Sequence, residues 1–551
     1  MWVAMGNLIQ APPCQTPNAS IDLQFTPSLG LVYNSYLSNS DGSWQFMSDS
    51  QQALAAIQNL LHSQDYAGAF MLAQQSVQQS TEDAELWHLA GVLAAQHGEY
   101  LLAKSYLLHA HRQASNNPNI HNHLGNVFAH LGEHAEASHH YHHALQLQPD
   151  FADAYNNIGN LHFRAGDINA AIKVYEHCVY IDPKHAPGHL NLGKALSKQE
   201  RFEQAEQHFF QASELDPALA DAHYNLGVIA RQIGKMSLAL KGFWRYSAAR
   251  PHDVDGFYQL AFTYQEMGNL EESIQYYQHV LASDPKHAKA HHNLATMYHK
   301  MEKIDLAEKH YATSLACDPK NPIATYLLAA IRQQHQAFAQ APEDYVTSLF
   351  DQYALHYDQH LSQHLNYQVP QQLIHFLQQE PGFLLPNRLK ILDLGCGTGL
   401  CGTLLHPYAR QLIGVDLSSN MLSAAQHRGV YANLIQANIK DYLQHSPPLN
   451  CDLIIAAEVL LYFGDLVPLL RLCHQHLNST GIMIFSLERL DTATEASDYY
   501  LDHTGRFCHS TDYISTSCQA IGFTVKRCAS IVLRTHQGKP VEGLAVQLSR
   551  T

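Results

Sequence analysis

Residues 153–183 read "DAYNNIGNLHFRAGDINAAIKVYEHCVYIDP", a pattern typical of two helices joined by a tight turn. Gly159 is small enough to let the two helices approach closely. Gly166 suits the left-handed backbone that ends the first helix. Ala171 and Tyr175 place a small and a large side chain one turn apart on the second helix. The stretch therefore predicts a helical hairpin, which the closing proline separates from the next segment.

The hairpin is one unit of a repeat with a period of 34 residues. Seven repeats fill residues 84–321, and a weaker one at 50–83 keeps the small residue Ala69. Residues 322–336 are expected to form a solvating end helix, which completes a repeat array at 50–336. The periodic prolines are Pro149, Pro183, Pro217, Pro251, Pro285 and Pro319, and the periodic small residues are Gly91, Gly125, Gly159, Gly193, Gly227, Ala261 and Ala295.

This pattern resembles the tetratricopeptide repeat, in which helix pairs stack into a right-handed α-solenoid with a concave, protein-binding face. The resemblance implies that the residue two positions before each periodic small residue lines that groove. We predict that these side chains pair with the backbone of an extended peptide. The alternative is that they bond between neighbouring repeats. The residues are His123, Asn157, Asn191, Asn225, Gln259 and Asn293.

Composition limits the classes of partner. The chain has 551 residues and a formal charge of −16, with no run of Lys or Arg, which argues against a nucleic-acid partner. Its ten cysteines include no CxxC pair, and we expect reduced thiols and a cytoplasmic protein. No signal peptide or membrane-spanning segment is recognisable. Residues 1–46 are expected to be a disordered arm, or an upstream extension if translation starts at Met47 rather than Met1.

Beyond residue 340 the period ends and a second pattern begins. Short apolar runs alternate with helix-length segments, which predicts βαβ units and a parallel sheet covered on both faces. The last two runs lack an intervening helix and are expected to form an antiparallel hairpin that turns near Gly538. The seven predicted strands lie at 389–395, 411–417, 432–438, 451–458, 481–487, 524–533 and 543–550.

Residues 391–400, "ILDLGCGTGL", contain the end of the first predicted strand and the glycine-rich loop that continues from it. Such a loop lets the backbone approach a ligand closely at the carboxyl edge of the sheet. Asp416 ends the second strand, where a carboxylate can accept both hydroxyls of a ribose. A dinucleotide would also fit the glycine-rich loop and Asp416. Asp393, directly before the loop, suits a cationic ligand with a free amine instead. The closing hairpin is also foreign to the dinucleotide-binding fold.

The motifs "LDLGCGTGL", "GVDLSSNML", "IQANIKDYL" and "CDLIIAAEVLLYF" resemble those of class I methyltransferases that use S-adenosylmethionine. The resemblance covers about 345–550, and the whole chain is similar to bacterial proteins that join tetratricopeptide repeats to such a domain. It implies a Rossmann-like α/β domain at 389–551, with a seven-stranded sheet and a final antiparallel hairpin. Linker and lid helices would occupy 337–388, including Tyr353 and Tyr357, which could close over the cofactor or simply pack in the core.

The resemblance also assigns residues to the cofactor. Asp416 would bind the ribose, Leu417 and Met421 would lie beside the adenine, and the amide oxygen of Asn438 would face the adenine amino group. Asn438 stands where the family often has Asp. The full set of predicted cofactor-binding residues is Asp393, Gly395, Cys396, Gly397, Thr398, Gly399, Asp416, Leu417, Met421, Asn438, Ile439 and Glu458.

No motif singles out a catalytic residue. His356, Glu458 and Tyr462, with His474, are possible bases, and a base helps only if the acceptor loses a proton in the transition state. The (N/D)PPY motif of amino-group methylation is absent after the fourth strand, where the chain reads "AAEVLLYF". Carboxyl, hydroxyl, thiol and carbon acceptors remain open.

The sequence thus predicts an S-adenosylmethionine-dependent methyltransferase acting on a protein or carrier-bound acceptor recruited by the repeats. Two alternatives stay open: a non-catalytic interaction scaffold, and a small-molecule methyltransferase whose repeats serve oligomerisation. The sequence does not fix the acceptor, its reacting atom, the partner of the repeats or the oligomeric state.

Histidine is unusually frequent, with 39 residues in the chain. His139 and His143 lie one helical turn apart, a spacing that can hold a metal. Such histidines more often form a polar face, and we predict no metal site.

A bulk consequence of the histidines can be measured. Because the reference pKa of His is about 6.5, the charge of −16 should fade and then reverse as the pH falls through this value. We expect solubility to drop in this range, as precipitation assays between pH 8 and 5.5 would record. A flat solubility curve over this interval would contradict the expectation.

Overall fold

The computed structural model describes residues 49–79, 82–334, 337–351, 367–490, 498–536 and 539–550. The chain divides into two compact units, one ending at Gly256 and the other beginning at Phe257. The expected arm at 1–46, and with it Met47, lies outside the described residues. No helix in the described ranges is long and apolar enough to cross a membrane.

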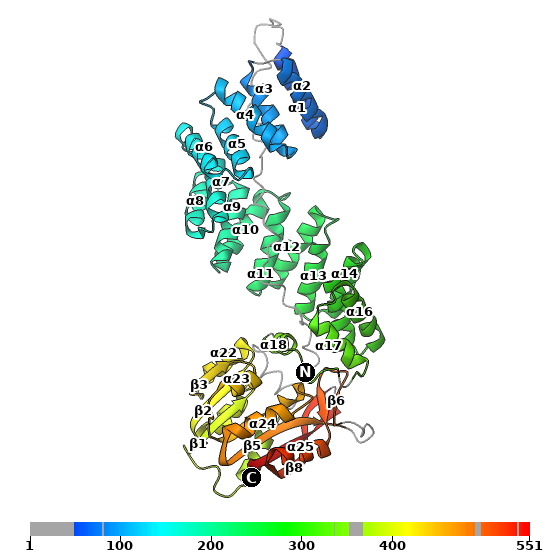
Figure 1. Cartoon of the computed structure of the whole chain (residues 1–551). Coiled ribbons are helices and arrows are strands. Elements are labelled where there is room, and N and C mark those ends of the chain that lie inside the picture. The colour runs from blue at the N-terminus through cyan, green and yellow to red at the C-terminus, as the bar shows by residue number, and fades with distance from the viewer. Residues whose placement is uncertain are drawn as a thin grey trace. The chain divides into compact units, whose positions relative to one another are not determined.

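The first unit consists of consecutive helices that pack as hairpins (Figure 1). The weak repeat forms such a pair too, although it lacks the periodic glycine and proline. The helices are α1 (Asp49–His62), α2 (Tyr66–Gln79), α3 (Ala84–Gln96), α4 (Tyr100–Gln113), α5 (Pro118–His130), α6 (His134–Leu147), α7 (Ala152–Arg164), α8 (Ile168–Ile181), α9 (Ala186–Lys198), α10 (Phe202–Leu215), α11 (Ala220–Gln232) and α12 (Met236–Ala249).

In four hairpins of the first unit the periodic glycine faces an aromatic ring. A Cβ atom added at Gly159 would lie 2.4 Å from the ring of Tyr175, so only glycine permits this approach. The same geometry recurs between Gly125 and Tyr141. Gly166 follows α7 with φ = +81°, as expected for the turn between the helices. The close approach and the left-handed turn predicted from residues 153–183 are both confirmed.

The second unit begins with helices of the same kind. These are α13 (Val254–Glu266, which starts in the first unit), α14 (Leu270–Ser283), α15 (Ala288–Lys300), α16 (Ile304–Cys317) and α17 (Pro322–Ile331). Helix α17 was expected to be solvating, and this was wrong. Tyr326, Leu327 and Ala330 on it are buried, because α17 packs on α16 and also meets the sheet domain that follows.

The described residues of the sheet domain form nine strands, seven of which follow the order β3-β2-β1-β4-β5-β7-β6. In addition, β9 runs antiparallel to β5 and pairs with β8. The five strands β1 to β5 are parallel to one another where they pair. The strands are β1 (Leu389–Leu394), β2 (Ala409–Asp416), β3 (Asn433–Gln436), β4 (Cys451–Ala456), β5 (Leu477–Arg489), β6 (Tyr499–Leu501), β7 (Phe507–His509), β8 (Phe523–His536) and β9 (Lys539–Arg550).

All seven predicted strands are present, and the final pair is the antiparallel hairpin that was expected. Its turn near Gly538 lies outside the described residues. Sequence analysis missed β6 and β7, because three residues each are too few to show a period. Between and before the strands lie α18 (Glu343–Asp351), α20 (Val369–Gln378), α21 (Leu400–Leu405), α22 (Ser419–Arg428), α23 (Ile439–His445), α24 (Val467–His476), α25 (Thr511–Ile521) and two short 3₁₀ turns, η2 (His406–Tyr408) and η3 (Leu460–Tyr462).

Chain order reverses between β1 and β4, since β2 and β3 lie on one side of β1 while β4 and β5 continue on the other. In open α/β sheets this reversal opens a crevice at the carboxyl ends of the strands. The fold therefore places a ligand site where β1, β2 and β4 end.

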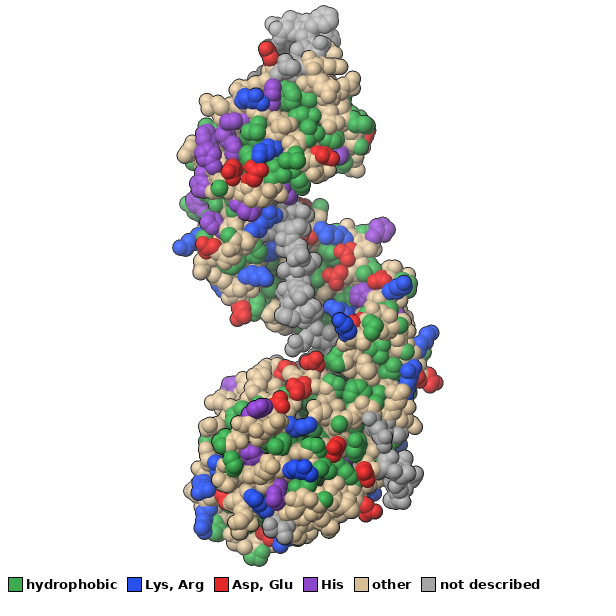
Figure 2. All heavy atoms as spheres, viewed as in Figure 1, with side chains coloured by type: hydrophobic (Ala, Val, Ile, Leu, Met, Phe, Trp, Pro, Cys, Tyr) green, Lys and Arg blue, Asp and Glu red, His purple; other side chains and the backbone are tan. Residues whose placement is uncertain are grey.

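Histidines of the repeat helices form pairs in which one ring is buried and the other is half-buried. Figure 2 shows histidine side chains gathered over the α5–α8 stretch. In three repeats the second member of a pair follows the first by 19 residues, and the two Nδ1 atoms lie 2.9–3.0 Å apart. The pairs are His121 with His140, His189 with His208, and His291 with His310.

A tautomer follows from the outer contact of each pair. The Nε2 atom of the first histidine lies 2.9–3.2 Å from a backbone carbonyl, which can only accept. Nε2 must therefore carry the proton, which leaves Nδ1 as the acceptor for its partner. A further proton on the pair would place an N–H group on both facing Nδ1 atoms, and these groups would repel each other. Burial first, and then the facing histidine, lowers the pKa of His140, His208 and His310 to about 4.

We therefore expect the array to lose stability in acid. Between pH 6.5 and about 4 the unfolded chain binds protons that the folded pairs do not, so the free energy of unfolding falls as pH falls. The triple variant His140→Gln, His208→Gln, His310→Gln should flatten the pH dependence of the urea midpoint. His142→Gln, an exposed position on α6, is the matched control. Equal slopes in the wild type and the triple variant would refute the expectation.

Candidate functional site

A pocket of about 740 Å³, measured with the part open to solvent, lies where β1, β2 and β4 end. This size is ordinary for small-molecule sites. Eight of the twelve predicted cofactor-binding residues line it: Gly395, Gly397, Asp416, Leu417, Met421, Asn438, Ile439 and Glu458. The other lining residues, which sequence analysis assigned no place in the cofactor site, are Gln340, Ala341, Glu343, Val346, Phe350, Ala457, Val459, Tyr462 and Phe463.

The glycine loop forms one wall of the pocket with its backbone. Gly395 and Gly397 have φ values of +63° and +54°, which glycine adopts without strain. A Cβ atom on Gly395 would lie 2.2 Å from Cγ2 of Val459. Val459 itself lines the pocket, so a side chain at position 395 would have to displace this wall.

Asp416 stands at the end of β2, across from the glycine loop. One carboxylate oxygen accepts a hydrogen bond from the backbone N–H of Gly397 at 2.9 Å, and the other accepts one from Ser418, also at 2.9 Å. Burial raises the pKa of Asp416, and these backbone donors oppose the rise. The carboxylate is thereby fixed in orientation at the pocket wall.

Four predicted residues lie outside the pocket lining: Asp393, Cys396, Thr398 and Gly399. The buried carboxylate of Asp393 accepts a hydrogen bond from the Tyr431 hydroxyl at 2.6 Å. Burial and the charge of Asp416 raise the pKa of Asp393 to about 7, against the effect of that hydroxyl. In this structure the Asp393 carboxylate is bonded to Tyr431, and its contact with a ligand amine stays a prediction.

Asn438 was expected to turn its amide oxygen toward an adenine amino group. The structure uses this oxygen elsewhere, since it caps α23 by accepting from the backbone of Lys440 at 2.8 Å and of Asp441 at 3.4 Å. The amide nitrogen donates to Glu343 at 2.7 Å. Glu343 thus supplies the carboxylate at this end of the pocket. It lies some fifty residues before β1, where no motif marks it.

Helix α18 covers this end of the pocket and is held there by hydrogen bonds. The carboxylate of Asp351 accepts from the Ser418 hydroxyl at 2.5 Å, and its backbone carbonyl accepts from Asn420 at 2.8 Å. Before the helix, the backbone of Ala341 donates to Tyr462 at 2.8 Å. The predicted lid residues Tyr353 and Tyr357, and the candidate base His356, lie outside the described residues.

Glu458 and Tyr462 are the candidate bases that reach the pocket, whereas His474 packs against Phe523 and is absent from its lining. Glu458 has φ = +53°, an uncommon conformation for a residue other than glycine. Its Oε1 accepts from Arg534, but no partner for its buried Oε2 exists among the described residues. Burial raises the pKa of Glu458 and Tyr462, opposed in each case by a nearby arginine.

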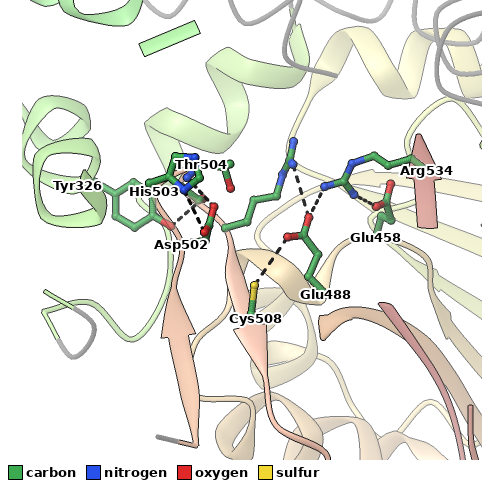
Figure 3. A network of polar contacts seen from close by, with 10 residues as sticks. Tyr326, Glu458, Glu488, Asp502, His503, Thr504, Cys508 and Arg534 are labelled. Carbon is green, nitrogen blue, oxygen red and sulfur yellow. Dashed lines mark hydrogen bonds and ion pairs between the residues drawn. The ribbon is translucent and has the colours of Figure 1, made fainter. Parts of the chain in front are cut away.

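Arg534 on β8 joins two buried carboxylates. Its guanidinium donates to Glu458 beside the pocket and to Glu488 on β5, as Figure 3 shows. Arg506, between β6 and β7, forms a second ion pair with Glu488 at 3.5 Å. Burial would raise the pKa of Glu488, yet Arg534 and Arg506 together lower it. Sequence analysis missed both arginines, because they are far from every motif and become neighbours only when the sheet forms.

The repeat residues predicted to line a groove make contacts inside the array. Asn157 donates to Asn122, and Asn191 donates to Asn156, each at 2.9 Å and each across 35 residues to the preceding repeat. Within the first unit, a cleft of about 280 Å³ is lined by Asn122, His123, Asn126, Asp153, Asn156, Asn157 and Pro187. For Asn157 and Asn191 these contacts are those of the alternative considered above, bonding between repeats, whereas Asn225 donates to Asp221 in its own helix. Peptide binding in the cleft stays a prediction.

Comparisons with protein families find both parts of the chain. A family described as a methyltransferase domain matches residues 392–485. Families of tetratricopeptide repeats match residues 125–166, 152–185, 190–253 and 255–320. The two resemblances inferred from the motifs are thereby confirmed.

Among curated relatives, the chain is 27% identical over 166 residues to a ubiquinone biosynthesis O-methyltransferase of Azorhizobium caulinodans, covering 27% of this chain and 65% of the relative. It is 31% identical over 99 residues to the protein of that name from Bradyrhizobium diazoefficiens, covering 18% and 39%. The chain thus spans less than two thirds of these relatives. Among solved structures, the chain is similar to YrrB, described as a tetratricopeptide-repeat protein with an unusual peptide-binding site. The two chains are 22% identical with a TM-score of 0.32, and the match covers 34% of this chain and 96% of YrrB.

The buried guanidinium of Arg534 is predicted to stabilise the folded sheet domain. Arg534→Met would leave Glu458 and Glu488 without their shared partner, and removing one partner of a buried ion pair costs about 3–5 kcal/mol. Urea unfolding followed by intrinsic fluorescence would measure this loss. Arg489→Met is the matched control, since this exposed arginine of β5 contacts Ser530 and should cost about 0.5 kcal/mol or less. Equal losses in the two variants would contradict the assigned role.

Proposed function

We propose that this chain, which joins tetratricopeptide repeats to a methyltransferase domain, is an enzyme that takes its methyl group from S-adenosylmethionine. The observation that supports it most strongly is the pocket itself. A glycine loop, a fixed carboxylate after β2 and an apolar wall meet at the point where chain order in the sheet reverses. The curated relatives of the sheet domain carry the name O-methyltransferase.

The residues present fit this cofactor. Gly395 leaves no room for a side chain, so the backbone of the loop can lie against the ligand. Asp416 would accept the ribose hydroxyls, although its oxygens already receive two backbone N–H groups. Leu417, Met421 and Ile439 would bracket the adenine on the side of the pocket that α18 covers.

The cofactor supplies an electrophilic methyl group on a sulfonium, and the protein supplies position and exclusion of water. Glu458 would act on the acceptor side. Its unpartnered Oε2 can accept a hydrogen bond from an acceptor hydroxyl and take the proton if one must be lost. Burial raises the pKa of Glu458, which strengthens it as a base, and Arg534 keeps Oε1 in place.

We further propose that the acceptor is attached to a protein or carrier that the repeats recruit. Binding at the repeats would raise the local concentration of the acceptor near the pocket without any new contact in the pocket itself. An oxygen acceptor agrees with the missing (N/D)PPY motif and with the names of the relatives. A small-molecule acceptor, with the repeats serving oligomerisation, is the alternative within the enzyme class.

The site assignment is tested at Asp416. Asp416→Ala removes a bidentate, charge-assisted contact, and we expect the affinity for S-adenosylmethionine to fall by about 10- to 100-fold. Isothermal titration calorimetry of the full chain would measure it. Asp441→Ala, an exposed acid in the first turn of α23, is the control and should bind as the wild type does.

Two results of this titration would count against the proposal. Unchanged affinity in Asp416→Ala would remove the ribose assignment. A wild-type chain that binds no S-adenosylmethionine would favour the scaffold, in which the repeats carry the function alone.

A further inference from the structure

The loop between β6 and β7 is a tight hairpin that carries Arg506. The backbone of Asp502 donates to the carbonyl of Arg506 at 2.8 Å, and Gly505 donates back to Asp502 at 2.9 Å. Gly505 has φ = +76°, and Thr504 donates to the Asp502 carboxylate at 2.8 Å. These bonds fix the conformation of residues 502–506, so a contact on one side of the loop also constrains the other.

Helices of the last repeats hold one side of this loop. The buried hydroxyl of Tyr326 on α17 donates to the carbonyl of Gly505 at 3.0 Å (Figure 3). His299 on α15 lies 2.8 Å from the carbonyl of His503 through Nε2. Because a carbonyl can only accept, Nε2 of His299 must be the donor. Leu327 lies 3.2 Å from the position of a Cβ atom on Gly505.

The other side of the loop reaches the pocket. Arg506 directly follows Gly505, is 2% exposed and pairs with Glu488 at 3.5 Å. Glu488 shares Arg534 with Glu458, whose carboxylate lines the pocket. The path from Tyr326 to Glu458 therefore consists of contacts between buried polar groups and of the backbone between Gly505 and Arg506. Figure 3 labels Tyr326, Glu488, Arg534 and Glu458 among its members.

We infer that α15 and α17 position the acceptor side of the pocket through the 502–506 loop, with Arg506 and Arg534 as positioning residues for Glu458. The inference rests on the proposed function, because that proposal assigns Glu458 to the acceptor side of the pocket. Neither arginine is itself a lining residue of the pocket. Arg534 fixes the carboxylate of Glu458, which lines the pocket. Arg506 fixes the carboxylate of Glu488, which shares Arg534 with Glu458.

The physical reason lies in the burial of the charges. Glu458 and Glu488 are 6% and 7% exposed, so water cannot replace an arginine that moves away. If Gly505 loses its bond from Tyr326, the backbone next to Arg506 loses one of the two helix contacts that hold it near Glu488. Arg534 then has to balance more of the negative charge of Glu488, and its ion pair with Glu458 changes. Occupancy of the pocket and order in α17 should therefore influence each other reciprocally.

Hydrogen–deuterium exchange of the full chain, with and without S-adenosylhomocysteine, tests this link. We expect the ligand to slow exchange at residues 391–400, and also at 499–509 and in α17. In Tyr326→Phe the slowing in α17 should disappear while that at 391–400 remains. Tyr141→Phe is the matched control, since the buried Tyr141 hydroxyl on α6 bonds Asn126 on α5 at 2.8 Å, outside the path, and its pattern should match the wild type.

A binding cycle adds a second readout, which does not depend on exchange. Tyr326→Phe and Arg506→Lys should each weaken S-adenosylhomocysteine binding by about 2- to 10-fold, because each removes one link of the same path. The double variant should be no weaker than the weaker single variant, since either change breaks the path. A merely structural role would make the two effects multiply. Melting curves should confirm that each variant is folded, and the exchange test of Tyr326→Phe does not depend on Arg506→Lys folding.

The outcomes separate this inference from the proposed function. Slowed exchange at 391–400 with none in α17, an α17 response that survives Tyr326→Phe, or multiplying effects in the cycle would overturn the positioning path while leaving the cofactor site intact. Exchange that is unchanged at 391–400 as well would overturn the cofactor site, and the positioning path with it.

Discussion

A buried carboxylate needs a cation beside it, and this requirement organises the acceptor side of the pocket. Glu458 lies where β4 ends and Glu488 lies on β5, and Arg534 of β8 is shared between them. The last hairpin therefore does more than complete the sheet, because it brings the cation that the pocket wall requires. Glu458 also adopts φ = +53°, a conformation that persists only where its surroundings over-determine it. The shared cation and the bond from the Glu458 backbone to Ser486 at 2.9 Å supply that constraint.

The repeat array follows a different constraint, the contact between a residue without a Cβ atom and an aromatic ring. At Gly125 and Gly159 the facing ring leaves no space for even a methyl group. The hydroxyls of these rings also bond inside the array, from Tyr141 to Asn126 at 2.8 Å and from Tyr175 to Asn160 at 2.6 Å. Apolar contact and buried polar contact thus come from the same side chain. Both kinds of contact therefore hold the helices of a hairpin together.

Much of this architecture could be predicted from sequence, because periodicity and local motifs encode it. The helix pairs, the glycine turns and seven strands follow from spacing, and most of one pocket wall follows from the resemblance to methyltransferases. Local motifs fail where a residue acts at long range. Glu343 and α18, which cover the pocket, precede the sheet by a stretch with no motif.

The sequence by itself determined the repeat array, the α/β sheet and the glycine loop with Asp416, since each depends on residues that are neighbours in the chain. Only the tertiary structure decided three other features. It buried α17 against the sheet domain, placed Arg506 and Arg534 on Glu488, and oriented Glu458 toward the pocket. These contacts join residues that are from 18 to about 180 positions apart. No local pattern records such a pairing, because it exists only after the strands and helices have packed together.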